Sequence, residues 1–320
     1  MRKFKLLTLI ITIITALCLS SCTTVPVFES SSNAAESGAE NEGISSAPQS
    51  AAAEDGSSDS TAAADGRLRI LFIDIGQGDS ELIMLPDGKT VLVDAGNPGD
   101  GSVISGILHE NGVSRIDYLI ATHPHADHIG GMAEIVKNFE IGRIFAPRLP
   151  ASKTPTTKTY ERFLDAVADK GYKLTAPAVG DILFEGDGYS AVCLAPSGGS
   201  YSGLNNYSIV FNLSFKQNKF LFMGDAEEES EAEIPEQSLA ADVLKVGHHG
   251  SSSSSSKTFL KAVSPKYAVI SCEEGNSYGH PHEETLENLK SVGATVYRTD
   301  LSGSILCTSD GQSIDFKEEK

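Results

Sequence analysis

The stretch "ATHPHADHIGG" (residues 121–131) places three histidines and an aspartate within six positions and ends on paired glycines. It follows "DYLI", an apolar run that predicts a buried strand, and it precedes "GMAEIVKNF", whose apolar spacing predicts a helix. In extended backbone, His123 and His125 point to the same side and can chelate one ion. Asp127 and His128 face a second position at the turn into the helix. The stretch therefore predicts a metal centre at the end of a buried strand.

Seven of the eight histidines fall in three places, "HPHADH", "VGHHGS" and "YGHPHE", and each place follows a predicted buried strand. Asp225 ends another such strand, "FLFMGD". Strand ends in mixed α/β folds present side chains to a shared crevice. The alternative is a polar loop with chance histidines, but the repetition at later strand ends favours a metal centre. Nitrogen and oxygen donors without sulfur suit Zn²⁺, and also Mn²⁺ or Fe.

The rest of the domain predicts an α/β fold. Apolar or alternating runs such as "RLRILFIDI", "SELIMLP", "TVLVDAG", "YSAVCLAP", "YSIVFNLSF" and "KYAVISCEE" predict strands. Helical spacing is seen in "KTYERFLDAVADKG", "SKTFLKAVS" and "HEETLENLKSVG", and around residues 103–111. Runs of strands interrupted by helices in both halves predict two sheets with helices outside, a four-layer αββα sandwich.

The N-terminus predicts export. "MRKFK" is a basic segment, and "LLTLIITIITALCLS" is an apolar run that is short for a membrane span. The run ends in "LSSC", which resembles the lipobox of bacterial lipoprotein signal peptides. The resemblance implies a signal peptide of residues 1–21, lipidation of Cys22, and a protein anchored on the extracytoplasmic face of the cell membrane. A plain secretory signal or an uncleaved anchor is the alternative.

Residues 22–66 are rich in Ser, Ala and Glu and contain few large apolar residues, which predicts a disordered tether. Residues 67–320 then form one domain. The formal charge of the chain is −18, of which −13 belongs to this domain, because the first 66 residues carry three basic and eight acidic side chains. Such a charge argues against a high-affinity nucleic-acid binder, which normally presents a basic face.

Three cysteines of the domain, Cys193, Cys272 and Cys307, lie inside apolar strand-like runs. No C-x-x-C spacing occurs in the chain. The sequence therefore predicts buried core thiols rather than a disulfide framework or a thiolate metal site.

"THPHADHIGG" resembles the H-x-H-x-D-H signature of the metallo-β-lactamase superfamily. "FIDIGQGDS", "VLVDAG", "NNYSIVF", "FLFMGD", "DVLKVGHHGS" and "YGHPHEETLENL", in this order, resemble the metallohydrolase domain of the ComEC competence (DNA-uptake) proteins. The resemblance implies the αββα fold and two divalent metal ions. Zn²⁺ is the expected metal, and Mn²⁺ is the alternative. It implies His123, His125, Asp127 and His128 as metal ligands and Asp225 as the carboxylate that bridges the two ions. His248 or His280 would supply the remaining ligand.

The resemblance also implies supporting residues around the metal ions. Asp94 would orient a ligand histidine, unless it only caps a turn. Asp79 belongs to the glycine-rich turn "IGQGDS", whose backbone amides could hold a substrate oxygen, or which is a plain tight hairpin. No histidine stands between His128 and His248, and "LNNYS" occupies that region. Asn205 and Asn206 of this region are therefore expected as weaker ligands or substrate contacts. His249 is expected as a supporting or substrate-contacting group, with a surface role as the alternative. Ser251 could offer its hydroxyl to a phosphate, or it only begins a serine loop (residues 251–256) that leads to a helix.

These features predict a hydrolase in which a metal-activated hydroxide attacks a phosphodiester, with Asp127 or His280 moving the proton. The substrate class includes DNA and wall polymers, and no protein partner is predicted. The alternatives are a cell-surface phosphoesterase acting on phosphorylcholine-type wall polymers, a β-lactam hydrolase, and a tethered binding or sensor module without turnover.

Overall fold

The computed structural model describes residues 65–320. The predicted signal peptide, the predicted lipid site at Cys22 and all but the end of the predicted tether lie outside the described residues. Within residues 65–320, no helix is long and apolar enough to cross a membrane.

The first sheet contains eight strands in the order β15-β14-β1-β2-β3-β4-β5-β6. Alternating exposure along β1 and β14 marks strands with one face in the core, as their sequence alternation predicts. The bounds are β1 Leu68–Phe72, β2 Glu81–Met84, β3 Thr90–Val93, β4 Arg115–Ile120, β5 Glu140–Phe145, β6 Leu174–Thr175, β14 Ile305–Ser309 and β15 Ile314–Glu318.

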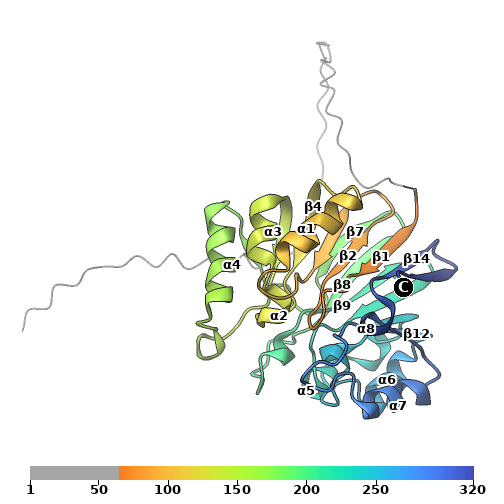
Figure 1. The fold of residues 1–320 in the computed structure, drawn as a ribbon. Coiled ribbons are helices and arrows are strands. Elements are labelled where there is room, and N and C mark those ends of the chain that lie inside the picture. The colour runs from red at the N-terminus through yellow and green to blue at the C-terminus, as the bar shows by residue number, and fades with distance from the viewer. Residues whose placement is uncertain (1–64) are drawn as a thin grey trace, which may run out of the picture.

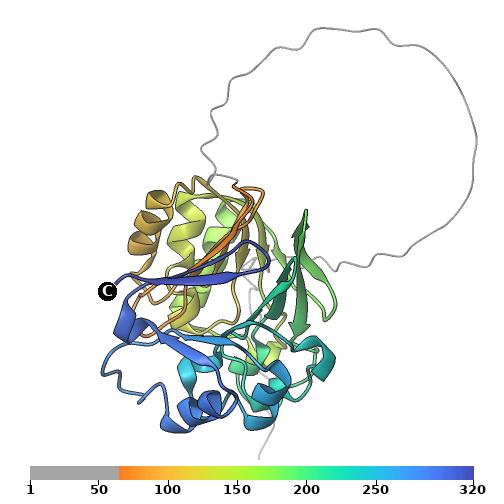
Figure 2. The same cartoon turned by 90° about the vertical axis from the view of Figure 1, so that its right-hand side faces the viewer.

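The second sheet contains seven strands in the order β13-β12-β11-β10-β9-β8-β7. Their bounds are β7 Ile182–Gly186, β8 Tyr189–Ala195, β9 Val210–Phe215, β10 Asn218–Phe222, β11 Val243–Lys245, β12 Tyr267–Ile270 and β13 Thr295–Arg298. The last two strands of the chain leave this half and return to the first sheet, where β14 pairs antiparallel with β1 (Figure 2). The two ends of the domain are therefore held in one sheet.

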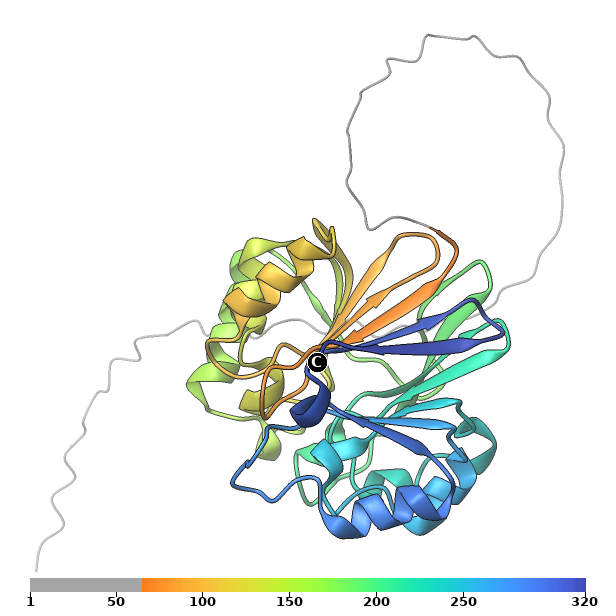
Figure 3. The same cartoon turned by 45° about the vertical axis from the view of Figure 1, so that its right-hand side comes forward.

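The two sheets and the helices outside them form four layers (Figures 1 and 3). Three hydrophobic clusters fill the spaces between these layers. One lies between the first sheet and its helices, one between the two sheets, and one between the second sheet and its helices. The helices on the first sheet are α1 Gly101–Glu110, α3 Met132–Asn138 and α4 Lys158–Asp169, and those on the second are α6 Lys257–Val263 and α7 Glu283–Ser291. The predicted αββα sandwich is confirmed.

Several predictions of local structure are also confirmed. Cys193, Cys272 and Cys307 are buried free thiols. The serine loop does lead to a helix, since the hydroxyl of Ser256 accepts a hydrogen bond from the N–H of Phe259 and caps α6. The sequence did not predict the shorter helices, which are α2 Ala126–Ile129, α5 Glu228–Glu231, α8 Thr299–Ser302, η1 Ala151–Lys153, η2 Asn205–Tyr207, η3 Glu236–Ser238 and η4 Gly247–Gly250.

The strands that carry the histidines run parallel to their neighbours. β3, β4 and β5 form parallel pairs in the first sheet, and β10, β11 and β12 do so in the second. The carboxyl ends of parallel strands lie at one edge of a sheet. The loops after β4, β10, β11 and β12 therefore lie at corresponding edges, where the two sheets bring them together.

Candidate metal centre

The "HPHADH" segment follows β4, bends at His123 and Pro124 instead of continuing in the expected extended backbone, and enters α2, whose first residue follows His125. His123 and His128 are fully buried, and His123 Nε2 lies 3.0 Å from His125 Nδ1. The glycines after the helix are required by a neighbouring loop. A Cβ at Gly130 would lie 2.0 Å from the backbone carbon of Asn97, so a side chain there would collide with that loop. The segment is thus held rigidly against the body of the first half.

Asp225 follows β10 and reaches the histidines from the second half of the sandwich. Its Oδ1 lies 3.2 Å from His128 Nε2, while its Oδ2 lies 3.7 Å from His123 Nε2. The carboxylate is 2% exposed. One buried carboxylate therefore presents each of its two oxygens to a different imidazole.

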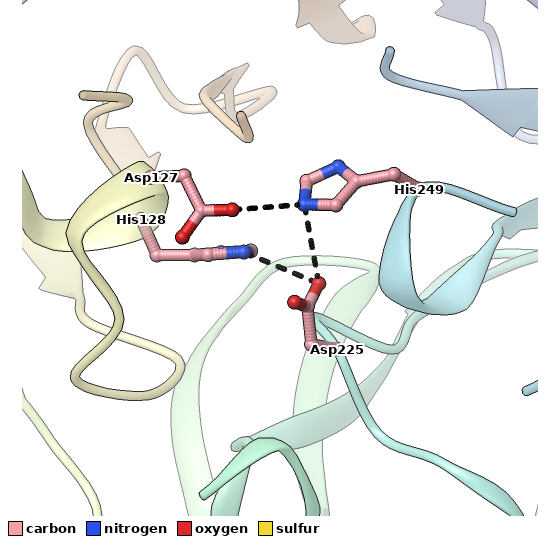
Figure 4. Close-up of side chains that lie close together, drawn as sticks. All are labelled: Asp127, His128, Asp225 and His249. Carbon is pink, nitrogen blue, oxygen red and sulfur yellow. Dashed lines mark ion pairs between the residues drawn. The ribbon is translucent and has the colours of Figure 1, made fainter. Parts of the chain in front are cut away.

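The turn after β11 carries His248 and His249 in left-handed backbone, with φ of 49° and 54°. This conformation is uncommon for residues other than glycine and is retained where the surroundings demand it. The turn buries His249 and directs its Nε2 to a point 3.4 Å from Asp127 Oδ2 and 3.6 Å from Asp225 Oδ1 (Figure 4). The strained turn thus gives His249 its position among the carboxylates.

Two groups of side chains have ligand atoms close enough together to hold a metal ion and share Asp225. The first consists of His123, His125 and Asp225; the second consists of Asp127, His128, Asp225 and His249. This grouping differs from the sequence expectation at the "HH" pair. His249 was expected only to support the site, and His248, which was expected as a ligand, lies outside both groups. The order of these two residues in the turn does not reveal which one faces inward.

Three buried atoms of the second group have no hydrogen-bond partner: His128 Nε2, Asp225 Oδ1 and His249 Nε2. The other ring nitrogen of each histidine is engaged, since His128 Nδ1 lies 2.7 Å from Asp94 Oδ2 and His249 Nδ1 lies 3.0 Å from the carbonyl of Ser271. Because Nδ1 donates the proton in the rings of both His128 and His249, each Nε2 carries a lone pair, and both Nε2 atoms face Asp225 Oδ1. An orphaned buried polar atom costs about 1–3 kcal/mol. A divalent cation would satisfy all three atoms, so these residues fit a metal ion.

The charges of the group also favour a cation. Burial alone would lower the pKa of His249, but the carboxylates of Asp225 and Asp79 raise it to about 10. Burial alone would likewise lower the pKa of His128, and Asp225 and Asp94 raise it well above its usual range. For Asp127 burial would raise the pKa, and the close approach of His249 Nε2 at 3.4 Å together with the charge of His128 lowers it to about 2. The carboxylates therefore outweigh burial and favour positive charge between them.

Asp94 lies where the sequence predicted, behind a histidine. Besides its contact with His128, its Oδ1 accepts a hydrogen bond of 2.8 Å from the backbone N–H of Thr122. Asp94 itself has a φ of 54°, another left-handed backbone at a residue other than glycine. Its carboxylate holds the imidazole by the nitrogen that faces away from the metal position, which fixes the direction of the other nitrogen.

The first group is less complete than the second. His123 Nδ1 lies 3.2 Å from Thr122 Oγ1, which leaves Nε2 directed at Asp225, but the group has three members against four. Asn205 and His248 border its open side: Asn205 Nδ2 lies 3.3 Å from His248 Nε2, and His248 Nε2 lies 3.8 Å from Asp225 Oδ2. The region without a midway histidine therefore brings an amide to this place.

A cleft of about 310 Å³ opens onto both groups. His280 forms one wall, and burial together with the charges of His248 and His249 lowers its pKa to about 4, so the ring is neutral at neutral pH. Tyr278 stacks on His280 at 5.6 Å and is 65% exposed at the mouth. The lining residues are Gln77, His125, Ala126, Asp127, Asn205, Asp225, His248, His249, Tyr278 and His280.

Three residues expected near a substrate lie elsewhere. Ser251 is buried in the serine loop, where its carbonyl accepts a hydrogen bond from Thr285 Oγ1. Asn206 is buried and its amide bonds Glu227 and Glu229. Asp79 directs its carboxylate into the protein, and its backbone N–H donates to the carbonyl of Asp127, so the glycine-rich turn braces the centre. None of the three lines the cleft.

Other residues of the site were missed by the sequence reasoning. Glu227 Oε1 lies 3.2 Å from His248 Nδ1, but it belongs to the acidic run "DAEEESEAE", where nothing distinguishes one carboxylate. Gln77 Nε2 lies 3.4 Å from His280 Nδ1. Lys245 is buried against Asp79, and the sequence does carry a signal for it, because it is the single charged residue in the apolar run "VLKV" (residues 243–246).

Residues 74–273 match the metallo-β-lactamase superfamily. The chain belongs to this superfamily. The expected resemblance to competence proteins is confirmed as well. The chain is 32% identical over 253 residues to ComE operon protein 3 of Bacillus subtilis. This match covers 73% of the chain and 32% of that protein. It is 29% identical over 238 residues to Recombination protein 2 of Haemophilus influenzae, which covers 73% of the chain and 28% of that protein.

Competence protein ComA of Neisseria gonorrhoeae is 30% identical over 236 residues, which covers 72% of the chain and 31% of that protein. The chain thus spans about a third of the length of these relatives. Among solved structures, the metallo-β-lactamase fold protein YhfI from Bacillus subtilis superposes with a TM-score of 0.50 at 15% identity, covering 76% of the chain and 99% of YhfI. The diiron β-hydroxylase CmlA from Streptomyces venezuelae superposes with a TM-score of 0.50 at 15% identity, and the match covers 76% of the chain and 54% of CmlA. These structures agree with the fold.

Proposed function

We propose that this protein is a metal-dependent hydrolase that cleaves phosphodiester bonds at the cleft over Asp225. The observation that carries the proposal is the position of this carboxylate, with one oxygen toward His123 and the other toward His128. Two groups of donors that share one carboxylate fit two divalent ions, of which Zn²⁺ or Mn²⁺ suits nitrogen and oxygen donors. A phosphodiester suits such a pair, because both the attacking and the leaving oxygen need stabilisation.

The side chains of the cleft have different roles in the proposed reaction. Bound divalent ions would supply Lewis acidity toward a phosphoryl oxygen and would lower the pKa of a bound water. Asp127 is held within the second group by its contact with His249, so it orients that group. His280 faces the cleft with a neutral ring steadied by Gln77 and is the side chain placed to accept and pass on a proton.

Two of the relatives support nucleic acid as one substrate class, because their names refer to recombination and to competence. The charge of −18 for the chain disfavours a long polyanion. The cleft of about 310 Å³ admits the end of a chain or a small diester rather than a duplex. A terminal phosphodiester of a nucleic acid is thus the favoured form of this substrate.

A second candidate substrate is a phosphodiester that carries a quaternary ammonium group, as in phosphorylcholine. The exposed ring of Tyr278 stands at the mouth of the cleft, and Glu227 lies behind two lining residues, His248 and Asn205, which it contacts. Aromatic faces and carboxylates together bind quaternary ammonium groups. This alternative agrees with the acidic charge of the chain and with the location that we propose below.

Hydrolysis of bis-p-nitrophenyl phosphate tests the reaction. The chelated protein should be inactive and should recover with added Zn²⁺ or Mn²⁺, and Asp127→Ala should lose activity while keeping its fold. Absence of turnover in protein that binds two metal ions would favour the binding-module alternative instead. Thymidine 5′-p-nitrophenyl phosphate, p-nitrophenyl phosphorylcholine and nitrocefin then separate the nucleic-acid, choline and β-lactam substrates.

We also propose that the protein acts on the outer face of the cell membrane, held by lipid on Cys22 after removal of residues 1–21. The "LSSC" sequence after an apolar run supports this location. Cells that express the chain should incorporate labelled palmitate into it and retain it in the membrane fraction. Cys22→Ala should abolish the label, and persistence of the label would place the lipid elsewhere.

A further inference from the structure

A buried lysine lies directly beneath the second group of metal-binding residues. Lys245 ends β11, pairs with Phe222 and Val269 on the neighbouring strands, and is 2% exposed. Its Nζ lies 2.6 Å from Asp79 Oδ2 and 3.7 Å from Glu81 Oε1. Asp79 and Glu81 belong to the first half of the sandwich, so the lysine joins the two halves by charge.

Asp79 connects this lysine to His249. While Asp79 Oδ2 faces Lys245, Asp79 Oδ1 lies 3.4 Å from His249 Nδ1. This contact is electrostatic, because the hydrogen bond of His249 Nδ1 goes to the carbonyl of Ser271, and Asp79 Oδ1 has no hydrogen-bond partner among the described residues. The backbone N–H of Asp79 donates to the carbonyl of Asp127 at 3.1 Å. Gly78 permits this approach, because a Cβ there would lie 2.6 Å from the same carbonyl oxygen. One residue thus braces two members of the second group.

Stability alone does not explain a lysine at this place. The neighbouring side chains between the sheets are apolar, as in Phe222 and Val269. A buried ion pair is often no more stable than apolar residues of the same volume, because both charges lose their hydration. The pair does have a geometrical consequence, since an ammonium on one side of Asp79 directs the other carboxylate oxygen toward His249.

We propose that Lys245 is a positioning residue of the metal centre. Its ammonium holds the carboxylate of Asp79 against the Nδ1 edge of His249 and so fixes the direction of His249 Nε2 toward Asp127 and Asp225. The inference rests on the proposed metal centre and not on the substrate. According to this inference, metal binding by the second group depends on Lys245, whereas metal binding by the group of His123 and His125 does not.

The test measures zinc affinity on the purified full chain by competition with a chromogenic chelator. Lys245→Met leaves a buried carboxylate unpaired and should lower the urea midpoint of unfolding. The double variant Asp79→Asn with Lys245→Met removes both charges at similar volume and should recover that midpoint. In the double variant one zinc equivalent should still bind about 10–100-fold more weakly, the usual effect of losing a group that orients a ligand, while the other stays within about threefold.

Glu81→Gln is the matched control, because Glu81 Oε1 lies 3.7 Å from Lys245 without a hydrogen bond. It should leave both affinities unchanged. Unchanged affinities in the double variant would overturn the inference. Equal weakening of both equivalents, or failure of the double variant to fold, would also overturn it, because either result assigns the pair a structural role only. Wild-type protein that binds no zinc would overturn the proposed function together with this inference, whereas inactivity with two zinc ions bound would affect the proposed function alone.

Discussion

The two groups of metal-binding side chains share Asp225 but differ in how firmly their other members are held. In the second group, His128 and His249 are buried, and each has its Nδ1 engaged by Asp94 or by Ser271. In the first group, His123 is held by Thr122, but His125 is partly exposed at the cleft. The first group is also bordered by His248, whose ring is 23% exposed and contacts Glu227 and Ser253.

This difference indicates which of the two metal-binding groups the fold holds more rigidly. The second group joins the two halves of the sandwich, because Asp127 and His128 come from α2 while Asp225 and His249 follow β10 and β11. Its two histidines and Asp225 are buried and held before a metal ion binds, which lowers the ordering cost of binding. Both groups border the cleft, where a substrate would approach, but the first has three members against four and a partly exposed histidine, His125. We therefore expect the second position to bind metal more tightly and the first to be the more exchangeable.

Loss of the shared carboxylate should have the largest effect. Asp225→Asn removes the anionic bridge from both groups, and Lewis-acid stabilisation of several kcal/mol corresponds to a loss of about 10³-fold or more in kcat/KM. Metal analysis should show fewer than two bound ions per chain. Asp242→Asn is the control, because Asp242 pairs with Lys266 outside the cleft. Full activity of Asp225→Asn would remove the basis for a bridged centre.

The two adjacent histidines offer the sharpest comparison. His249→Ala should lose one tightly bound metal ion and about 10²-fold in activity, because it removes a member of the buried group. His248→Ala should retain that ion and lose about tenfold or less, since His248 only borders the other group. Metal content and kcat/KM of both variants check this. The reverse order of effects would place His248, and not His249, in the tight site.

Metal removal and return should be stepwise. After chelation, the first zinc equivalent should bind about tenfold or more tightly than the second, because preorganised donors lose less freedom on binding. Chelator competition followed by an activity assay at each equivalent measures both steps. His249→Ala should abolish the tighter step. A single step of two equal equivalents would show that burial of the second group gives it no advantage.

The smallest effect on the centre is expected from Glu231, a buried carboxylate away from the cleft. Burial, opposed by hydrogen bonds from the N–H groups of Ser255 and Ser256, raises its pKa to about 7 from 4.5. The folded protein therefore keeps a proton that the unfolded chain releases between these two values. The group destabilises the fold progressively as pH rises from about 4.5 to about 7, by a few kcal/mol at most.

Urea unfolding of wild type and Glu231→Gln at several pH values measures this effect. The variant should lose the decline in unfolding free energy over that pH range and should bind zinc as the wild type does. A parallel decline in both proteins would assign the pH dependence to other groups.

The sequence predicted those parts of the site that depend on local order. "HPHADH" places its histidines and Asp127 between the end of a strand and the start of a helix, and both features depend on a few consecutive residues. Asp225 and the "HH" pair could be recognised as strand ends for the same reason. The contact of Asp94 with His128 was also expected, since a ligand imidazole needs a partner for its second nitrogen.

The sequence could not decide which of two adjacent histidines enters the centre, or that Ser251 and Asn206 face away from it. Those outcomes depend on the left-handed turn at His248 and His249 and on the packing of the serine loop against α7. Likewise, Asp79 has no local signal that pairs it with Lys245, because they are 166 positions apart.

The sequence by itself thus determined the fold class and most of the donors, because hydrophobic periodicity and strand ends are local properties of the chain. Only the tertiary structure decided how those donors divide into two groups. Each group takes members from different loops of the sandwich, and the distances among them are set by the packing of two sheets whose strands lie far apart in the sequence.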